Sequence, residues 1–297
     1  MRADEAGATI MKPAALIAFL LLLASSARGH AAEVTWEPAT LVNGSPCVFR
    51  VRLPANLSSL RGAWQGKTVH FSFDPESGLW QGLAGIDLDT RPGSHPLALE
   101  AVSAAGQHTV YKQKIPVAKG AYRVTALSVA KKFTEPDPET LRRIRKEKRL
   151  KDRVFRLITP ERFWSGRIEA PAQTVTTGEF GSQRTFNGVR QSVHQGLDYR
   201  ASIGTPVTAI SEGQVILARD LFFEGGFLVL DHGQGLLSLY MHLSAFKVKE
   251  GDRVDQGQLV ALSGGTGRST GPHLHLGVRW QGVYVDPAIL LRLSLPD

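Results

Sequence analysis

Short apolar runs alternate with polar residues along the first part of the chain. Between Val34 and Val117 the runs CVFRVRL, GKTVHFSF, HPLALEAVS and HTVYKQKIPV each show a period of two. Strands that recur about every ten residues between glycine- and proline-rich turns are typical of a small antiparallel sandwich. We therefore expect an immunoglobulin-like β-sandwich over residues 34–118. There is no cysteine pair to form the disulfide of antibody domains.

The period changes to that of a helix between residues 136 and 158. Pro136 and Pro138 stand at or before the expected start of this helix, where proline is tolerated. Four apolar residues then fall on one helical face and predict the side that packs: Leu150, Val154, Leu157 and Ile158. We interpret residues 119–164 as a linker that contains this short helix.

Strand-like patterning returns after the helix. The runs TPVTAI, GQVILARD, GGFLVLDHG, LLSLYMHL and QLVALSG are separated by turns that contain glycine. They predict a compact, mostly antiparallel β domain over residues 165–290. The chain as a whole is thus predicted to be mainly β, with two β domains joined by a basic helical linker.

The first 31 residues have the pattern of a secretory signal peptide. Lys12 precedes an apolar run from Ala14 to Ala24, which is followed by small residues. A run this short does not comfortably span a bilayer, which favours cleavage over an uncleaved anchor. Two acidic residues precede Met11 and suit a signal poorly, so Met11 is a candidate start. We expect the protein to be exported to the periplasm or the cell exterior.

Composition adds two constraints. Cys47 is the only cysteine, so an internal disulfide is excluded and core packing or a metal must stabilise the exported chain. The formal net charge is +8, and residues 141–153 alone carry eight Lys or Arg against Glu147 and Asp152. This segment could contact an anionic cell envelope through phosphate polymers or lipid headgroups. The alternative is a solvated helix face between two domains. Nucleic acid is not expected as a partner, because the basic stretch lacks interleaved aromatic residues.

Histidines cluster in the second half of the chain. Five of the nine lie between His194 and His275. On a straight strand His194 and Asp198 would be roughly 13 Å apart, too far to share one small cation, so the chain must bend near Gly196. His273 and His275 are two residues apart and would point to one face of a strand.

This set has the composition of a catalytic zinc site. His194, Asp198 and one member of the His273–His275 pair would supply three nitrogen or oxygen ligands and leave a position open for water. Zinc lowers the pKa of a bound water towards about 7 and polarises carbonyl groups, so hydrolysis at neutral pH becomes accessible. Spacing alone does not tell which histidine of the pair would bind the metal.

Three separated motifs, HQGLDY, YMHL and STGPHLHLGV, together resemble the zinc metallopeptidases of the lysostaphin and LytM type, the M23 family. The resemblance covers roughly residues 165–290, and the motifs stand in the order of the family. It implies a β-sheet groove domain and an endopeptidase that cleaves peptidoglycan peptides. It implies one zinc ion per chain with three ligands: His194, Asp198 and His275. It implies two catalytic residues beside the metal-activated water: His242 and His273.

Two other functions stay open at this point. Relatives of this fold that have lost the metal ligands act as non-catalytic regulators of wall hydrolases, but here all five positions are occupied, which favours an enzyme. The N-terminal sandwich could also make this chiefly a wall-binding protein. No small-molecule cofactor is expected, because GGTGRSTG lacks the G-K-[ST] ending of a phosphate loop and leads into a strand.

Three further residues or segments receive an interpretation. His232 has no role in the resemblance and is interpreted as structural. Tyr240 lines the groove or, as is more common for an aromatic residue on a strand, belongs to the core. The N-terminal domain could cover the groove, with SQRTFNG supplying an occluding side chain. A direct cross-link between D-alanine and diaminopimelate is favoured over a glycine bridge as the bond that is cleaved.

Overall fold

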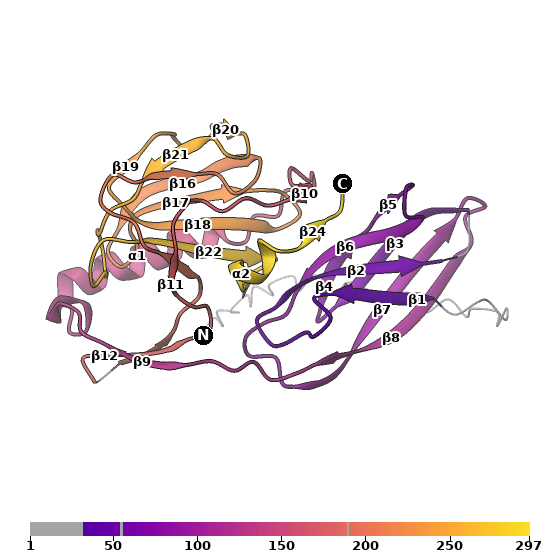
Figure 1. Cartoon of the computed structure of the whole chain (residues 1–297), viewed down its shortest axis with the longest axis horizontal. Coiled ribbons are helices and arrows are strands. Elements are labelled where there is room, and N and C mark those ends of the chain that lie inside the picture. The colour runs from indigo at the N-terminus through magenta and orange to yellow at the C-terminus, as the bar shows by residue number, and fades with distance from the viewer. Residues whose placement is uncertain (1–31, 54–55, 189) are drawn as a thin grey trace, which may run out of the picture.

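The computed structural model describes residues 32–53, 56–188 and 190–297. Two β-rich parts lie side by side, as Figure 1 shows, and the prediction of a mainly β chain is confirmed. The predicted signal peptide lies outside the described residues. Among the described residues, no helix combines the length and apolar character that crossing a membrane requires.

Two four-stranded antiparallel sheets make up the N-terminal part. One has the order β1-β2-β6-β5 and the other β4-β3-β7-β8. Their strands are β1 (Glu33–Glu37), β2 (Pro46–Arg52), β3 (Leu57–Trp64), β4 (Lys67–His70), β5 (Ser72–Asp74), β6 (Leu79–Gly85), β7 (Gly93–Ser103) and β8 (His108–Val117). In β3 the alternate residues Leu60, Gly62 and Trp64 are buried, as the period of two predicts. The Trp64 ring packs edge-on against Phe49 at 5.3 Å and donates a hydrogen bond to the carbonyl of Gly85.

The order of these strands supports the expected topology. If β5 is taken as the fourth strand of an immunoglobulin domain, the two sheets correspond to its ABED and C′CFG sheets. We propose on this basis that residues 34–118 form an immunoglobulin-like sandwich. The other predicted boundaries, those of the signal peptide, of the linker (119–164) and of the C-terminal domain (165–290), stay predictions.

An eight-stranded sheet forms the centre of the C-terminal part. Its order is β11-β14-β22-β18-β17-β16-β20, and β23 also pairs with β22. The strands are β11 (Thr176–Gly178), β14 (Leu197–Tyr199), β16 (Gly213–Leu221), β17 (Gly225–Asp231), β18 (Leu236–Leu243), β20 (Arg253–Val254), β22 (Leu274–Trp280) and β23 (Val283–Val285). Every residue of β17 is buried, which explains its continuous apolar run in the sequence.

Smaller sheets and a short helix surround this centre. A three-stranded sheet joins β15 (Pro206–Thr208), β21 (Leu259–Leu262) and β19 (Ala245–Phe246). A two-stranded sheet joins β10 (Gly166–Arg167) and β24 (Ser294–Leu295), and the helix α2 (Pro287–Leu290) precedes β24. A second three-stranded sheet has the order β13-β12-β9, with β9 (Val124–Leu127), β12 (Gln183–Phe186) and β13 (Arg190–Val193).

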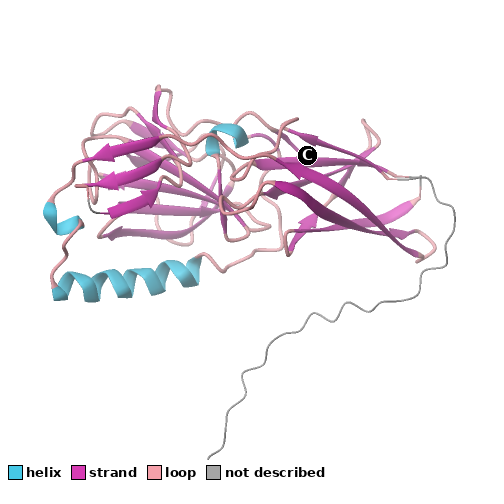
Figure 2. Ribbon diagram, turned by 90° about the horizontal axis from the view of Figure 1, so that it is seen from below, coloured by secondary structure: helices cyan, strands magenta, loops and turns pink. Residues whose placement is uncertain are grey.

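The segment predicted as a linker takes part in the fold of the C-terminal part. Its strand β9 pairs in parallel with β12. A single 3-10 turn (Lys131–Phe133) and the helix α1 (Pro138–Val154) follow. Figure 2 shows α1 along one side of the C-terminal part, outside the sheets.

Helix α1 begins as predicted but ends early. Asp137 caps it by accepting bonds from two backbone N–H groups of the first turn. At the other end, the N–H of Leu157 bonds to the carbonyl of Val154, three residues back, so the chain leaves the helix there. The expectation that Leu157 and Ile158 share the packed face is therefore wrong for both residues, which are 48% and 54% exposed.

The two parts of the molecule are packed against each other. A Cβ atom on Gly85 would lie 2.8 Å from Val285 and 3.0 Å from Trp280, so only glycine allows this approach. The Asp286 N–H donates to the carbonyl of Gly44 at 2.8 Å. The apolar core consequently runs from the N-terminal sheets into β22 and β23. Cys47 is a free thiol inside this core, and burial raises its pKa.

Candidate active site

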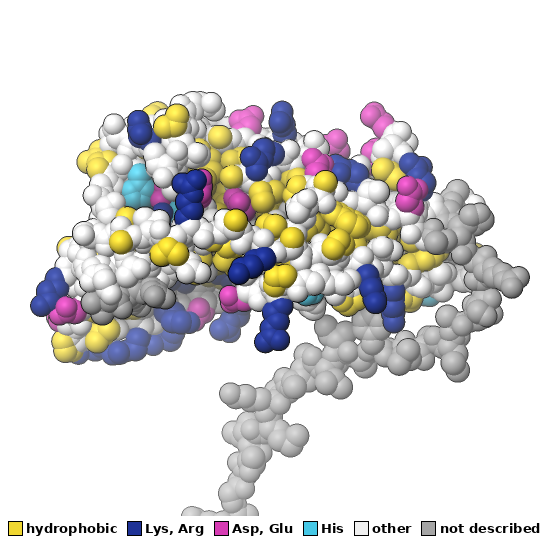
Figure 3. Space-filling model, turned by 60° about the horizontal axis from the view of Figure 1, so that its bottom comes forward, with side chains coloured by type: hydrophobic (Ala, Val, Ile, Leu, Met, Phe, Trp, Pro, Cys, Tyr) yellow, Lys and Arg dark blue, Asp and Glu magenta, His cyan; other side chains and the backbone are white. Residues whose placement is uncertain are grey.

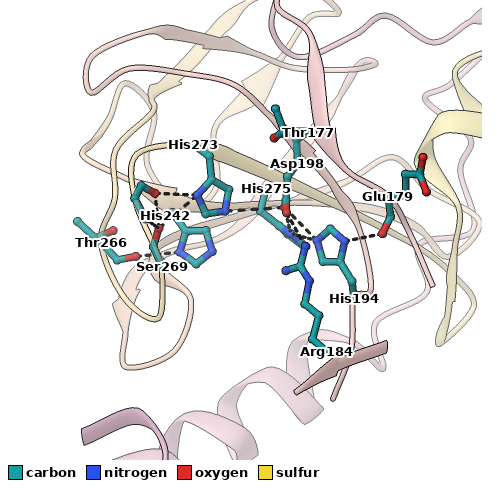
Figure 4. Close-up of polar contacts among 11 residues, drawn as sticks. Thr177, Glu179, Arg184, His194, Asp198, His242, Thr266, Ser269, His273 and His275 are labelled. Carbon is teal, nitrogen blue, oxygen red and sulfur yellow. Dashed lines mark hydrogen bonds and ion pairs between the residues drawn. The ribbon is translucent and has the colours of Figure 1, made fainter. Parts of the chain in front are cut away.

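Three side chains converge on one point in the C-terminal part. His194 Nε2 lies 2.9 Å from Asp198 Oδ1 and 2.9 Å from His275 Nδ1, and His275 Nδ1 lies 2.8 Å from the same Asp198 oxygen (Figure 4). All three residues are buried and form a group whose atoms could hold one metal ion. The structure thus brings together the three predicted ligands.

The fold explains how residues four apart in the chain can meet. His194 follows the end of β13, whereas Asp198 lies on β14 in the large sheet, opposite His275 on β22. The predicted bend between His194 and Asp198 is confirmed. Gly196 lies at this bend for a steric reason, because a Cβ atom there would be 2.4 Å from His275 Nε2.

The orientation of His194 favours a cation between these atoms. Its Nδ1 lies 2.7 Å from the backbone carbonyl of Glu179, which only accepts hydrogen bonds, so Nδ1 carries the proton. Nε2, the other ring nitrogen, then points at the carboxylate of Asp198. A metal cation at this point would be in reach of both atoms. A carbonyl that fixes the outer nitrogen of a ligand histidine is the usual support of a zinc site.

The protonation of Asp198 and His275 also suits metal binding. Burial acts to raise the pKa of Asp198, but its contacts with His194 and His275 outweigh burial and hold the pKa well below its ordinary value. Burial lowers the pKa of His275 to about 4. At neutral pH the group therefore presents a carboxylate and a neutral imidazole, the forms that bind metals. Two imidazole nitrogens and one carboxylate oxygen fit zinc with an open coordination position.

Arg184 on β12 contacts the second oxygen of the Asp198 carboxylate. Arg184 Nη2 donates to Asp198 Oδ2 at 2.7 Å, and the two side chains are 19% and 10% exposed. Asp198 Oδ1 thus faces the histidines while Oδ2 is held by the guanidinium. The contact fixes the rotation of the carboxylate and balances its charge. The sequence suggested only an occluding side chain from SQRTFNG, and gave no sign that Arg184 reaches Asp198.

His242 owes its position to an irregularity in β18. Between the pairs Leu228–Tyr240 and Gly226–Leu243, two residues of β18 oppose one residue of β17, which is a β-bulge. His242 has a backbone φ of +64°, a conformation that residues other than glycine seldom adopt. Such strained residues are common at functional sites.

The His242 ring is fixed and neutral. Its Nδ1 donates to the carbonyl of Thr266 at 2.8 Å, which leaves a lone pair on Nε2. Burial, followed by the positive charges of the neighbouring histidines, lowers the pKa of His242 to about 3. The ring is therefore neutral near pH 7 and presents the lone pair of Nε2.

His273 stands directly before β22 at the end of the STGP turn. Its Nδ1 lies 2.9 Å from the carbonyl of Gly271 and 3.2 Å from the hydroxyl of Ser269, so the turn holds the outer edge of the ring. His273 Nε2 lies 3.8 Å from Asp198 Oδ1. The ring centroids of His242 and His273 are 4.7 Å apart, and that of His242 is 6.2 Å from His275. Both predicted catalytic histidines therefore flank the ligand group.

Two other conspicuous residues have structural positions. His232 is fully buried, with its nitrogens 2.6 Å from the Glu212 carbonyl and 2.7 Å from the Ser238 hydroxyl. Burial lowers its pKa to about 4. The Tyr240 hydroxyl accepts a hydrogen bond from the Ile210 N–H inside the core. The structural interpretation of His232 is thus confirmed, and the alternative that Tyr240 lines the groove is wrong.

All five site residues open into one cavity of about 660 Å³. In Figure 3 a histidine side chain reaches the surface of the C-terminal part beside basic and acidic side chains. The cavity is also lined by residues that sequence reasoning missed, namely Arg123, Thr125, Leu127 and Val129. They come from the predicted linker and match no motif. Their alternation is visible in the sequence but does not reveal which strand they join.

The sequence profile of peptidase family M23 matches residues 192–287. A crystal structure described as a peptidase M23 from Pseudomonas aeruginosa is 32% identical in sequence, with a TM-score of 0.65. The alignment covers 84% of this chain and 94% of that one. This chain belongs to peptidase family M23. The family resemblance inferred from the three motifs is thereby confirmed.

Curated relatives match over shorter stretches. The peptidoglycan DD-endopeptidase ShyA of Vibrio cholerae is 44% identical over 107 residues, which are 36% of this chain and 24% of that protein. The glycyl-glycine endopeptidase ALE-1 of Staphylococcus capitis is 46% identical over 90 residues, which are 30% and 25% of the two chains. This chain thus spans about a quarter of the length of the curated relatives it matches.

Proposed function

We propose that this M23 peptidase is a zinc-dependent endopeptidase that hydrolyses peptide bonds in peptidoglycan stem peptides or cross-links. One observation carries the proposal: two imidazole nitrogens and a carboxylate oxygen converge within 2.9 Å of one another, beside two further histidines. Relatives named as peptidoglycan and glycyl-glycine endopeptidases support the choice of substrate.

The two fixed histidines, His242 and His273, would transfer protons during the reaction. When bound to the three ligands, zinc supplies a Lewis acid that polarises a carbonyl and makes water nucleophilic near neutral pH. His242 and His273 are each held through Nδ1 by a backbone carbonyl, which leaves Nε2 for the groove. Either nitrogen can accept a proton from the attacking water and, once protonated, donate a hydrogen bond to the developing oxyanion or a proton to the leaving amine.

Purified mature protein is expected to contain about one zinc ion per chain and to cleave cross-linked muropeptides. A chelator should remove both the metal and the activity, and added zinc should restore them. Elemental analysis measures the metal, and mass spectrometry of products from defined wall fragments identifies the bond. We propose the bond between D-alanine and diaminopimelate. Products cut only at glycine bridges would contradict that choice.

A non-catalytic regulator of wall hydrolases is the alternative. It would bind wall peptides without cleaving them and would need no metal. The neutral imidazole of His242 and the His273 ring, whose centroid lies 4.7 Å away, have no evident use in such a protein. Wall fragments that bind but stay intact after zinc loading would favour the regulator.

We also propose that the protein is exported and that α1 contacts an anionic surface of the cell envelope. Five exposed cations with helical spacing form one outer stripe of α1: Arg142, Arg145, Lys146, Arg149 and Arg153. In the part of the chain that the structure describes, none of the five forms an ion pair, whereas Arg143, Lys148 and Lys151 do. In Figure 3 a row of Lys and Arg runs along the lower edge, where Figure 2 places α1.

Replacing Arg142, Arg145 and Arg149 by glutamine is expected to weaken binding to anionic vesicles. Each cation near an anionic surface contributes about 1 kcal/mol, so the loss is roughly a hundredfold and disappears at high salt. Co-sedimentation with vesicles measures binding to lipid headgroups. A parallel titration with a soluble phosphate polymer measures binding to the other candidate, the phosphate polymers of the envelope. Lys148→Gln, which removes a cation already paired with Asp152, is the control. Equal binding of the triple variant and the parent would contradict the proposal.

A further inference from the structure

The strand β9 of the predicted linker forms a wall of the cavity that holds the catalytic histidines. Four residues with alternate positions line this cavity: Arg123, Thr125, Leu127 and Val129. The residues between them do not line it. Because successive side chains of a strand point to opposite sides, one whole face of β9 is turned towards the site.

The neighbouring strand β12 continues the same wall. Thr125 is the register partner of Arg184, and Leu127 is the partner of Phe186. Arg184 and Phe186 also line the cavity, so the two strands present a continuous face. We call the cavity-facing side of β9 and β12 the strand wall. Arg184 reaches from this wall to Asp198.

Backbone and side-chain bonds hold β9 in place. The Asn187 side chain accepts from the Val129 N–H at 2.9 Å and donates to the Val129 carbonyl at 2.9 Å. The Gln183 N–H donates to the carbonyl of Arg123 at 2.7 Å. Tyr122, just before the strand, donates a hydrogen bond to the carbonyl of Asn43 in the N-terminal part. The wall is therefore a fixed part of the cavity.

The length of this wall exceeds what cleavage of one bond requires. Arg123 and Val129 continue the cavity lining just outside the two ends of β9. From Arg123 to Val129 the lining covers six residue steps, at most about 20 Å, whereas three residues of substrate span about 10 Å. The family match begins at residue 192, so β9 and β12 both lie outside it. Their face offers a threonine hydroxyl in the middle, apolar side chains at one end and an arginine at the other.

We propose that Thr125 and Leu127 bind the substrate, an extended peptide of more than three residues that lies along the strand wall. This inference rests on the proposed function of the site. Thr125 provides a hydroxyl for the peptide backbone, and Leu127 provides an apolar contact for a side chain. The strand wall thus sets the length of peptide that the site binds best.

The experiment uses the full chain and two neighbouring substitutions of the same size. Thr125→Trp fills the cavity from the strand wall, while Val124→Trp adds the same ring on the opposite face, where Val124 is 73% exposed. Both positions belong to β9, where tryptophan is well tolerated. Leu127→Ala is a milder second variant in case the larger ring disturbs the strand.

Thr125→Trp is expected to raise KM for cross-linked muropeptide dimers at least about tenfold, and Val124→Trp to stay within about twofold of the parent. Leu127→Ala should raise KM by less. Binding of intact dimers to a His273→Ala background, measured by calorimetry, should show the same order. Metal content should be equal in all variants. Equal KM values for both tryptophan variants, or metal loss caused by Thr125→Trp, would overturn the inference.

The same measurements separate this inference from the proposed function. If the parent protein cleaves no wall peptide, the proposed function fails, yet binding to the His273→Ala background still tests the strand wall. If the parent cleaves dimers and Thr125→Trp does so with unchanged KM, the strand wall fails alone.

Discussion

Asp198→Ala is expected to lose its zinc and its activity together. Asp198 supplies the only carboxylate of the ligand group, and its removal leaves two imidazoles without an anionic ligand. Losing a partner outside the ligand shell already costs about 10- to 100-fold in metal affinity, so loss of a ligand should exceed a hundredfold. Zinc competition with a fluorescent chelator measures the affinity, and muropeptide cleavage follows the activity. His194→Ala should behave in the same way.

Arg184→Gln, compared with a control variant, tests whether metal binding also depends on the orientation of the Asp198 carboxylate. Arg184→Gln keeps all three ligands but removes the guanidinium that holds Asp198 Oδ2. We expect a 10- to 100-fold weaker metal affinity, the range typical of such supporting contacts. Arg123→Gln is the matched control, because Arg123 lines the same cavity but pairs with Glu179. Full metal occupancy in Asp198→Ala would refute the ligand assignment.

His273→Ala and His242→Ala are expected to keep the metal and lose turnover. Neither ring belongs to the ligand group, but both flank it with Nε2 available. Removal of a general acid–base or oxyanion group lowers kcat by roughly 100-fold or more. Steady-state kinetics and elemental analysis on the same preparation separate the two effects.

The control for these variants is His108→Ala. His108 lies exposed on β8 in the N-terminal part, and its ring pairs with Glu100, so its loss should leave both metal and kcat unchanged. A His273→Ala protein that loses its metal would show that this histidine is a ligand. The choice between His273 and His275, which spacing alone left open, would then have to be reversed.

Most of what could be predicted came from local patterns in the sequence. Period-two runs indicated the strands, and the H-x-x-x-D and H-x-H spacings indicated residues that can share a metal once the chain bends. Family resemblance, rather than spacing, chose His275 over His273 as a ligand. The bend near Gly196 followed from distance alone. The need for glycine there depends on the His275 ring, which comes from a strand 79 residues away in sequence.

The features that were missed depend on contacts between distant segments. The pairing of β9 with β12 joins residues about 60 positions apart, and nothing in either strand identifies its partner. The contact of Arg184 with Asp198 depends on that pairing. Helix α1 ends at Val154 although its apolar pattern continues to Ile158. Phe155 still packs beside Val154, whereas Leu157 and Ile158 are exposed.

The strand wall has a consequence for the search for inhibitors. A fragment confined to residues 192–287 lacks both β9 and β12, so its cleft is open on the side that these strands close in the whole protein. Compounds selected against such a fragment would not meet the strand wall. Compounds selected against the full chain would meet Thr125 and Leu127 as well, which offers a route to selectivity among related peptidases.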